Sequence, residues 1–322
     1  MSRLQDSWYR RRWFTWLLLP LSSLFCLLVM VRRILYRSGV LHSQRLPVPV
    51  IVAGNITVGG TGKTPLVIAL VEMLRLQGWN PGVISRGYGG LATQWPQTVD
   101  ADADARLVGD ESLLIALRTG APMAVGPDRV AAARHLLDKH AVDIIISDDG
   151  LQHYRLQRDV EIVVVDGVRG LGNGHCLPAG PLREPRGRLH QVDLIVVNGG
   201  GEQGVAMRLE PQPPRCVADG QQTKSLEAFR GQRVHAVAGI GHPQRFFSML
   251  EQAGLEIFSH PFPDHHRFSG ADIEFGDTAP VLMTEKDAVK CRTISDARHW
   301  YIPVTARLPD SFAQQLQTLL EK

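Results

Sequence analysis

Short apolar runs recur along most of the chain, and each of them stops at Gly, Asp, Asn or Thr. Runs of this length, rich in Val and Ile and closed by turn residues, are typical of strands that are buried on both faces of a parallel sheet. The runs occupy residues 47–55, 81–87, 142–150, 160–167, 192–200, 233–241 and 280–287. The pattern therefore predicts a largely parallel sheet whose two faces are both covered.

Stretches with helical spacing separate most of these runs. In residues 65–77 the apolar positions fall on one side of a helix, and Gly78 follows as a C-cap. Residues 128–140 and 243–253 are also long enough for helices. The alternation predicts an α/β protein with an open, mainly parallel sheet flanked by helices, and it places ligands at the carboxyl ends of the strands.

The segment at residues 13–31 contains 19 residues and no charge, and it lies between Arg10–Arg12 and Arg32–Arg33. As a helix it would be about 28 Å long, close to the roughly 30 Å hydrocarbon thickness of a bilayer. Pro20 in its middle and arginines on both flanks leave a helix lying in one leaflet open beside a single membrane span. A cleaved signal peptide and a buried core helix are the weaker alternatives.

Charge is distributed unevenly along the 322 residues. The formal net charge is +3, but the first 50 residues carry +7 and the remainder carries −4. A basic excess confined to one end argues against a nucleic-acid-binding protein and favours contact with anionic lipid head groups. The four cysteines show no Cys-x-x-Cys pairing and no metal-ligand spacing, which predicts reduced thiols and no structural zinc.

Residues 199–222 are rich in Gly, Pro and Gln and have little periodicity, so they are the best candidate for a boundary between two lobes. We therefore expect an N-terminal membrane anchor at 1–45, a core at 46–205 and a smaller C-terminal α/β lobe at 206–322. A hydrophobic content of 44% is sufficient for both lobes.

A glycine-rich turn follows the first predicted strand and precedes a predicted helix. It fits the end of the pattern G-x-x-x-x-G-K-[ST], although a threonine stands where the first glycine is expected. Backbone N–H groups there converge on phosphate oxygens, Lys63 would neutralise the β- and γ-phosphates, and the Thr64 hydroxyl takes a Mg²⁺ position. The alternative is a turn with a chance lysine. The predicted nucleotide-binding residues are Thr57, Val58, Gly59, Gly60, Thr61, Gly62, Lys63 and Thr64.

Two further strand ends carry candidate chemistry. Asp148 and Asp149 follow a hydrophobic strand and supply the carboxylates that a second Mg²⁺ anchor requires; an ordinary Asp-Asp-Gly turn is the alternative. Arg86 lies in a glycine-rich loop at the carboxyl end of another strand, where it could bind phosphate with two parallel hydrogen bonds or simply be solvated.

A kinase that acts on a hydroxyl group needs a carboxylate or an imidazole to accept or orient the proton. Asp110 with Glu111, and the Asp-His-His sequence at 264–266, offer such groups, although each is ambiguous alone. A rigid Pro- and Gly-rich loop presents Arg183 and Glu184.

Seven motifs, in order and spread over nearly the whole chain, closely resemble the lipid A 4′-kinase (tetraacyldisaccharide 4′-kinase) family. In that family a threonine opens the P-loop, so the departure at Thr57 supports the resemblance. The motifs are GNITVGGTGKTP (54–65), SRGYGG (85–90), VGDE (108–111), SDDGLQH (147–153), PAGPLREP (178–185), FPDHH (262–266) and TEKDAVK (284–290).

The resemblance implies a P-loop NTPase-type fold and transfer of the ATP γ-phosphate to the 4′-hydroxyl of an acylated glucosamine disaccharide 1-phosphate, with Mg²⁺. The product would be lipid IVA, a lipid A precursor of Gram-negative bacteria. The enzyme would work at the membrane surface, attached to the inner membrane with its catalytic body on the cytoplasmic side. Neither a nucleic acid nor an obligate protein partner is implied.

Residue roles carry over by motif. Asp110 looks like the catalytic carboxylate, paired with His265, and Lys63 and Thr64 look like the phosphate and Mg²⁺ residues. Arg86 is similar to a phosphate or transition-state contact, and His153 to a supporting polar residue. The further metal-site carboxylates are Asp148, Asp149 and Glu184. The roles of residues 285–287 stay open between nucleotide contact and an ordinary strand-end turn.

Two other classes of protein remain possible. The Gly-Gly-Thr-Gly-Lys-Thr turn resembles that of membrane-associated P-loop ATPases or GTPases that act as conformational switches. Those proteins usually carry an additional lysine at the start of the loop, and residues 55–58 here contain none. A scaffold that binds nucleotide without turnover is the third possibility.

Overall fold

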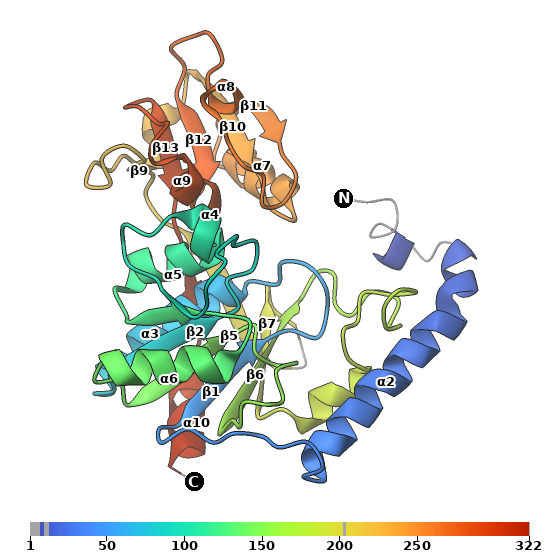
Figure 1. Ribbon diagram of the computed structural model, residues 1–322. Helices are drawn as coiled ribbons and strands as arrows, with labels where there is room; N and C mark the ends of the chain where they lie inside the picture. The colour runs from blue at the N-terminus through green and yellow to red at the C-terminus, as the bar shows by residue number, and fades with distance from the viewer. Residues whose placement is uncertain (1–6, 10–12, 202–203, 322) are drawn as a thin grey trace.

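The computed structural model of the chain describes residues 7–9, 13–201 and 204–321. Within these residues the strands form two sheets, which make a larger and a smaller lobe stacked one above the other (Figure 1). The larger sheet has the order β14-β8-β7-β6-β1-β5-β2-β4-β3, and the smaller has the order β11-β10-β12-β13-β9.

The larger sheet is parallel from β8 to β4, with the antiparallel strands β14 and β3 at its edges. β1 lies between β5 and β6, so the loops after these three strands emerge side by side. The strands are β1 (Val50–Gly54), β2 (Pro81–Ser85), β3 (Gln97–Thr98), β4 (Met123–Val125), β5 (Ile144–Asp148), β6 (Val160–Asp166), β7 (Leu194–Asn198), β8 (Val205–Pro211) and β14 (Val304–Arg307).

Helices cover both faces of this sheet, because its strands are apolar on both sides. One face packs against α3 (Lys63–Leu76), α5 (Asp110–Thr119) and α10 (Asp310–Leu320), and the other packs against α6 (Arg129–Lys139). The short helix α4 (Ala105–Val108) precedes α5. The predicted α/β fold with a mainly parallel sheet flanked by helices is confirmed.

The smaller lobe is also an α/β unit. Its helices are α7 (Pro243–Gln252), α8 (Gly270–Ile273) and α9 (Glu285–Cys291). Its strands are β9 (Arg215–Cys216), β10 (Arg233–Ala238), β11 (Glu256–Pro261), β12 (Val281–Thr284) and β13 (His299–Ile302), and short 3₁₀ helices occupy Trp13–Leu18, Arg186–Gln191 and Leu226–Phe229. The seven predicted strands contain β1, β2, β5, β6, β7, β10 and β12. Two predicted helices contain α6 and α7, and the third overlaps α3, which begins at Lys63, two residues before the predicted start.

The chain enters the smaller lobe after β8 and returns to the larger sheet through β14 and α10. Residues 205–211 and 304–320 thus belong with the larger sheet, whereas the predicted division assigned 206–322 to the C-terminal lobe. The difference has a physical cause. β8 buries only Met207 fully, so its sequence lacks the continuous apolar run of a central strand.

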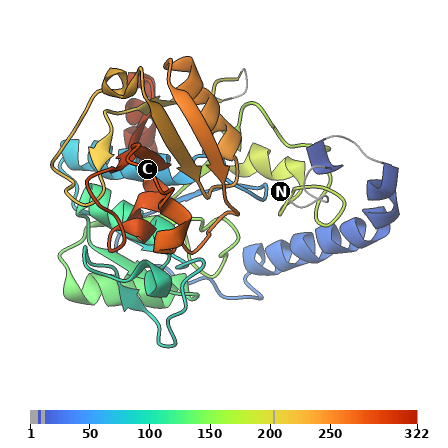
Figure 2. The same ribbon diagram turned by 90° about the horizontal axis from the view of Figure 1, so that it is seen from above.

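The N-terminal apolar segment forms α2 (Leu19–Arg37), which lies at the flank of the larger lobe in both views (Figures 1 and 2). Residues 15–37 are long and apolar enough to cross a membrane. The helix is docked on one side: Ser22 Oγ donates a hydrogen bond to the carbonyl of Cys176 at 2.7 Å, and the ring of Tyr36 lies 5.8 Å from that of Tyr154. The predicted basic flank at residues 10–12 lies outside the described residues.

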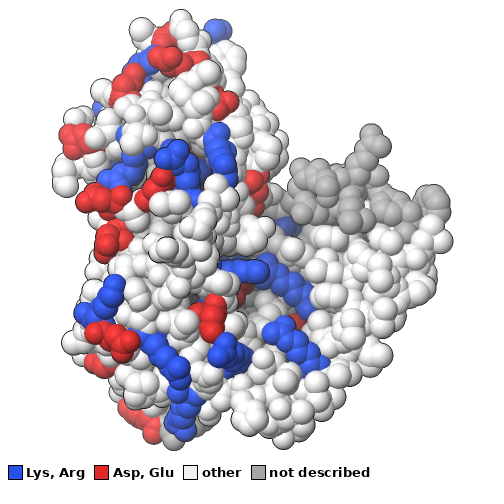
Figure 3. Space-filling view, viewed as in Figure 1, with Lys and Arg blue, Asp and Glu red and all other residues white. Residues whose placement is uncertain are grey.

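The opposite side of α2 is apolar and exposed. Figure 3 shows an uncharged surface over this helix, whereas Lys and Arg side chains gather at the junction of the two lobes and on the larger lobe below it. The exposed apolar side chains of the segment include Trp16, Leu17, Leu21, Leu24, Leu27, Leu28, Val31 and Ile34. The four cysteines form no disulfide among the described residues.

Candidate active site

The predicted P-loop connects β1 to α3, and two of its glycines are required by the backbone. Gly59 and Gly62 have φ values of 102° and 97°, a region that residues with side chains rarely adopt. A Cβ at Gly62 would also lie 2.6 Å from Asn198 Nδ2. Thr57 does not have a positive φ. A threonine can therefore replace the first glycine of the usual pattern without strain.

Neighbouring strands brace this loop from the side. Asn198, the last residue of β7, donates from Nδ2 to the carbonyl of Thr61 at 3.0 Å. Arg169 donates to the carbonyl of Gly60, and the N–H of Val58 donates to Pro181 at 2.8 Å. The loop is thus held open at the N-terminus of α3, where its N–H groups can receive an anion.

Lys63 begins α3, and its ammonium faces the end of β5. Its Nζ donates to Asn55 Oδ1 at 3.3 Å and lies 3.6 Å from Asp149 Oδ1. Thr64 lies in the first turn of the same helix. Both residues are therefore at the helix terminus that the pattern predicted for the phosphates.

Asp148 and Asp149 are adjacent, but their surroundings differ. Asp148 is buried: Oδ2 accepts a hydrogen bond from Ser85 at 3.1 Å, and Oδ1 has no hydrogen-bond partner among the described residues. Burial, with the nearby carboxylates of Glu111 and Asp149, raises the pKa of Asp148 to about 7. Asp149 has a φ of 49° and accepts two bonds from Arg183 Nη1, at 3.0 and 3.1 Å. Although burial acts the other way, Lys63 and Arg183 lower the pKa of Asp149.

Glu184 is fully buried beside this group. Its carboxylate accepts a hydrogen bond from Gln152 at 2.7 Å and another from the Tyr154 hydroxyl, and Arg188 Nε lies 3.3 Å away. The loop that carries it is tied to the start of the P-loop, because the N–H of Arg183 donates to the carbonyl of Ile56 at 2.7 Å. Both oxygens of Glu184 are therefore engaged, unlike those of Asp148. No cluster of three His, Cys, Asp or Glu that could cage a metal exists in the part of the chain that the structure describes.

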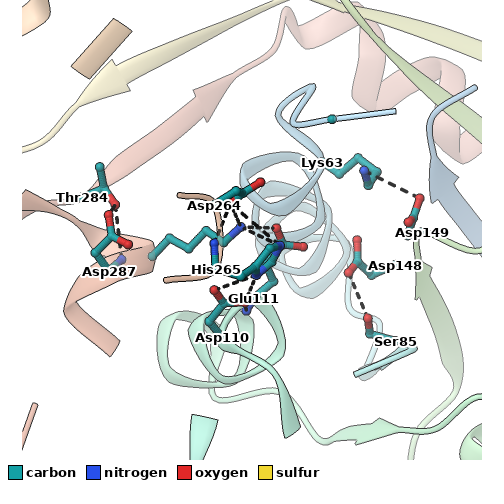
Figure 4. Close-up of polar contacts among 12 residues, drawn as sticks. Lys63, Ser85, Asp110, Glu111, Asp148, Asp149, Asp264, His265, Thr284 and Asp287 are labelled. Atoms are coloured by element: carbon teal, nitrogen blue, oxygen red, sulfur yellow. Dashed lines mark hydrogen bonds and ion pairs between the residues drawn. The ribbon is translucent and has the colours of Figure 1, made fainter. Parts of the chain in front are cut away.

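Asp110 and His265, 155 residues apart, meet across the two lobes (Figure 4). Asp110 is the first residue of α5 and is 5% exposed, and His265 lies in the turn after β11 with a φ of 59°. The His265 Nδ1 atom is 3.0 and 3.1 Å from the two carboxylate oxygens of Asp110. Burial raises the pKa of Asp110, but the bond from His265 and the charge of Lys286 outweigh it and lower that pKa. The same bond raises the pKa of His265, against the effect of burial.

The P-loop and the turn that carries His265 meet at Gly241 of the smaller lobe. A Cβ at Gly241 would lie 3.4 Å from Asp264 Oδ2 and 3.8 Å from the backbone nitrogen of Gly60. The charge of Glu111, the neighbour of Asp110, raises the pKa of Asp148, so the two groups lie within electrostatic reach of each other (Figure 4). The structure therefore brings the predicted phosphate residues and the predicted proton acceptors to neighbouring positions at the boundary between the lobes.

Arg86 and His153 lie at the periphery. Arg86 is exposed directly after β2, next to the serine that bonds Asp148. His153 lies 3.8 Å from Asp128, and burial together with the charge of Arg129 lowers its pKa to about 4. A neutral imidazole at this place fits the supporting role that the resemblance gives to His153.

Several residues that shape the site were not predicted. Asp166, at the end of β6, is buried. It accepts a hydrogen bond from Arg169 at 3.0 Å and another from Arg245 of α7 at 2.8 Å, so it links the smaller lobe to Arg169, which braces the P-loop. Asp166 and Asn198 both end a predicted strand, the position where ligands bind in such sheets, and this signal could have identified them. No motif marks Arg245.

The comparisons with known proteins agree with this geometry. Residues 14–321 match the sequence profile of the family described as tetraacyldisaccharide-1-P 4′-kinase. The chain is 54% identical to the tetraacyldisaccharide 4′-kinase of Nitrosococcus oceani over 98% of its length and 93% of the relative's, and 51% identical to that of Alkalilimnicola ehrlichii over 100% and 98%. A solved structure of LpxK from Aquifex aeolicus in complex with ATP superposes with a TM-score of 0.81 at 25% identity, covering 95% of this chain and 99% of the other. The resemblance carried by the seven motifs is thereby confirmed, and the chain belongs to the tetraacyldisaccharide 4′-kinase family.

Proposed function

We propose that this kinase transfers the γ-phosphate of ATP to the 4′-hydroxyl of a tetraacyldisaccharide 1-phosphate, giving lipid IVA in lipid A biosynthesis. The observation that carries the proposal is the meeting of two unlike groups at the boundary between the lobes. The P-loop with Lys63 supplies phosphate binding, and the Asp110–His265 pair supplies a proton acceptor.

Different residues of the chain bind the phosphates and accept the proton. The N–H groups of the P-loop and the ammonium of Lys63 bind the β- and γ-phosphates and stabilise the charge that develops on them. The Asp110–His265 pair orients the acceptor hydroxyl and takes its proton, and the two groups titrate together because they share a hydrogen bond. Arg86, exposed directly after β2, contacts the transferring phosphoryl group.

The donors at the end of β5 fit Mg²⁺. This ion takes one or two carboxylates together with phosphate oxygens and waters rather than a full protein cage, which agrees with the dispersed carboxylates found here. The unpartnered Oδ1 of Asp148 and the raised pKa of that carboxyl are what a divalent cation would correct. Thr64, Asp148 and Asp149 would hold the ion, which neutralises phosphate charge when bound. Glu184, the fourth predicted metal ligand, does not fit this role, because both of its oxygens are engaged by Gln152, Tyr154 and Arg188.

The docking of α2 favours a helix that lies in one leaflet over a single span. Contacts with the body extend from Ser22 to Tyr36, about 21 Å of helix. If this stretch crossed the roughly 30 Å hydrocarbon core, the attached polar body would have to enter the core as well. The exposed apolar side chains instead fit insertion of the outer side alone.

We further propose that the body lies on the cytoplasmic face of the inner membrane. ATP and reduced thiols both belong to the cytosol, and the chain has free cysteines. Proteolysis of sealed vesicles tests both statements, because a leaflet-bound helix leaves the N-terminal residues and the body accessible from the same side. Protection of the N-terminal residues alone would show a span.

Radiolabelled γ-phosphate from Mg-ATP tests the reaction directly. Label should move onto the acylated disaccharide 1-phosphate with the wild-type enzyme and fall by at least about a hundredfold in Lys63→Ala, Asp110→Ala and His265→Ala. Hydrolysis of ATP without transfer would favour the switch ATPase. Undiminished transfer in the three variants would show that the site is misplaced.

A further inference from the structure

The Thr-Glu-Lys-Asp motif at residues 284–287 places one lysine at the boundary between the lobes, directly against the Asp110–His265 pair. Lys286 is in the first turn of α9, and its ammonium lies 2.9 Å from Glu111 Oε1 of the larger lobe and 3.1 Å from Asp264 Oδ1 of the smaller lobe. It also lies 3.4 Å from His265 Nε2. One ammonium therefore contacts α5 and the turn that carries the histidine.

These contacts use all three donors of the lysine. The side chain is 16% exposed, and its three N–H bonds point to two carboxylates and one ring nitrogen. Burial opposes the charge, yet the surrounding carboxylates raise the pKa of Lys286 above its usual value, so it stays an ammonium throughout the working range of pH. A lysine engaged in this way acts on its neighbours and has no donor left for a substrate.

The effect on the pair has a definite direction. Nδ1 of His265 faces Asp110, so a second proton on the ring would have to be placed on Nε2, beside the Lys286 ammonium. Like charges this close oppose each other, and the Lys286 charge lowers the pKa of His265 as well as that of Asp110. The lysine thus offsets the tendency of the Asp–His hydrogen bond to keep the ring protonated.

Other charged groups around the pair arrive from every neighbouring element. Glu111 comes from α5 and Asp264 from the turn, and both face the lysine. On α9, Lys290 lies 3.9 Å from Asp110 and 2.8 Å from Asp287, and its charge also lowers the pKa of Asp110, though less than the charge of Lys286 does. The Tyr88 ring, 5.2 Å from that of His265, brings no charge. Lys286 is therefore the cation in contact with Nε2 among the described residues.

We propose that Lys286 is a positioning residue of the phosphoryl-transfer site, which ties the His265 turn to Glu111 across the lobes and keeps the His265 ring from taking a second proton, so that Asp110 is the group of the pair that accepts the substrate's proton. The backbone of His265 is left-handed, at a φ of 59°, which is uncommon for a residue with a side chain, and the bonds from Lys286 to Asp264 and His265 hold this turn in place. This inference rests on the proposed transfer reaction.

The pH dependence of kcat/KM for label transfer tests the inference. In Lys286→Met the acidic limb of the kcat/KM profile should move to higher pH by about one unit. At about pH 6 this shift lowers kcat/KM about tenfold, and the loss becomes smaller as the pH rises. Lys286→Arg keeps the charge and should leave the limb within about 0.3 unit of the wild type. A limb that stays in place in Lys286→Met, or that moves equally in Lys286→Arg, would overturn the proposal.

A matched control uses the other ion pair between α5 and α9. Arg118 donates two 2.8 Å bonds to Glu285, one residue before the lysine, and this pair does not touch His265. The single variant Arg118→Met, which leaves Glu285 unpaired, should lower the thermal midpoint without moving the limb. If it moves the limb as far as Lys286→Met does, the effect is loss of lobe packing and the proposal fails.

A second readout does not depend on turnover. NMR titration of the His265 ring, assigned by comparison with His265→Gln, should show a pKa about one unit higher in Lys286→Met than in the full-length wild type. Absence of transfer in the wild type would overturn the proposed function and leave this titration to decide the role of Lys286. An unchanged ring pKa would overturn that role even if transfer is confirmed.

Discussion

Replacing Asp148 by Asn should make the ligand-free enzyme more stable and, at the same time, inactive. The folded state holds this carboxyl at a pKa of about 7, against 3.8 for the ordinary group. Because the pKa is raised, the folded state binds more protons than the unfolded state between pH 3.8 and pH 7. The stability that Asp148 contributes is therefore complete below pH 3.8 and is lost as the pH rises through 7.

The size of the effect follows from the shift. About three pKa units correspond to about 4 kcal/mol of lost stability above pH 7, of which about 2 kcal/mol is lost between pH 5.5 and pH 8. Asn cannot ionise, so the difference in free energy of unfolding between Asp148→Asn and the wild type should be larger at pH 8 than at pH 5.5 by about 2 kcal/mol. For a protein of this size, about 2 kcal/mol is a difference of about 4 °C in thermal midpoint.

The assay is thermal unfolding without nucleotide at pH 5.5 and pH 8, followed by addition of Mg-ATP. The wild type should gain stability from Mg-ATP, and Asp148→Asn should lose most of that gain together with transfer. Asp149→Asn is the matched control with the opposite sign, because its carboxylate is paired with Arg183 and Lys63 and its removal should destabilise the protein at pH 8. An Asp148→Asn advantage that is equal at both pH values would refute the reasoning.

Three further predictions concern the loop, the lobes and the anchor. Gly62→Ala should abolish Mg-ATP binding measured by calorimetry, because the added carbon meets Asn198 at 2.6 Å in a left-handed backbone; Gly78→Ala, with open space around it, is the control. Arg118→Met should cost about 3 kcal/mol in urea unfolding by leaving Glu285 buried and unpaired, and adding Glu285→Gln should recover most of it. Changing the exposed Leu21 and Leu28 together to Ser should shift the enzyme from the membrane pellet to the supernatant, while transfer to detergent-dispersed substrate continues. Retention of this variant in the pellet would exclude the exposed side of α2 as the membrane-binding surface.

The elements that the sequence predicts well are those whose pattern is set locally. A central parallel strand is apolar on both sides, so β1 and β5 are evident from their composition, and the P-loop is evident because its glycines serve a backbone that no other residue adopts easily. Edge strands behave differently. β8 buries only Met207 fully and lacks a continuous apolar run, so its pattern is much weaker than that of a central strand, and the predicted lobe boundary falls too early in the chain.

The same reasoning explains which parts of the site a motif can reveal. Lys63, Asp148 and Asp149 follow strands of one sheet, and parallel topology alone brings such ends together. Asp110 and His265 belong to different lobes, and pattern and spacing place neither near the P-loop; only the family resemblance paired them. Their contact depends on how the lobes dock, which is decided by pairs such as Lys286 with Glu111 and Arg245 with Asp166. Each of those pairs joins residues far apart in the chain, so any account of proton acceptance here has to begin from the interface between the lobes.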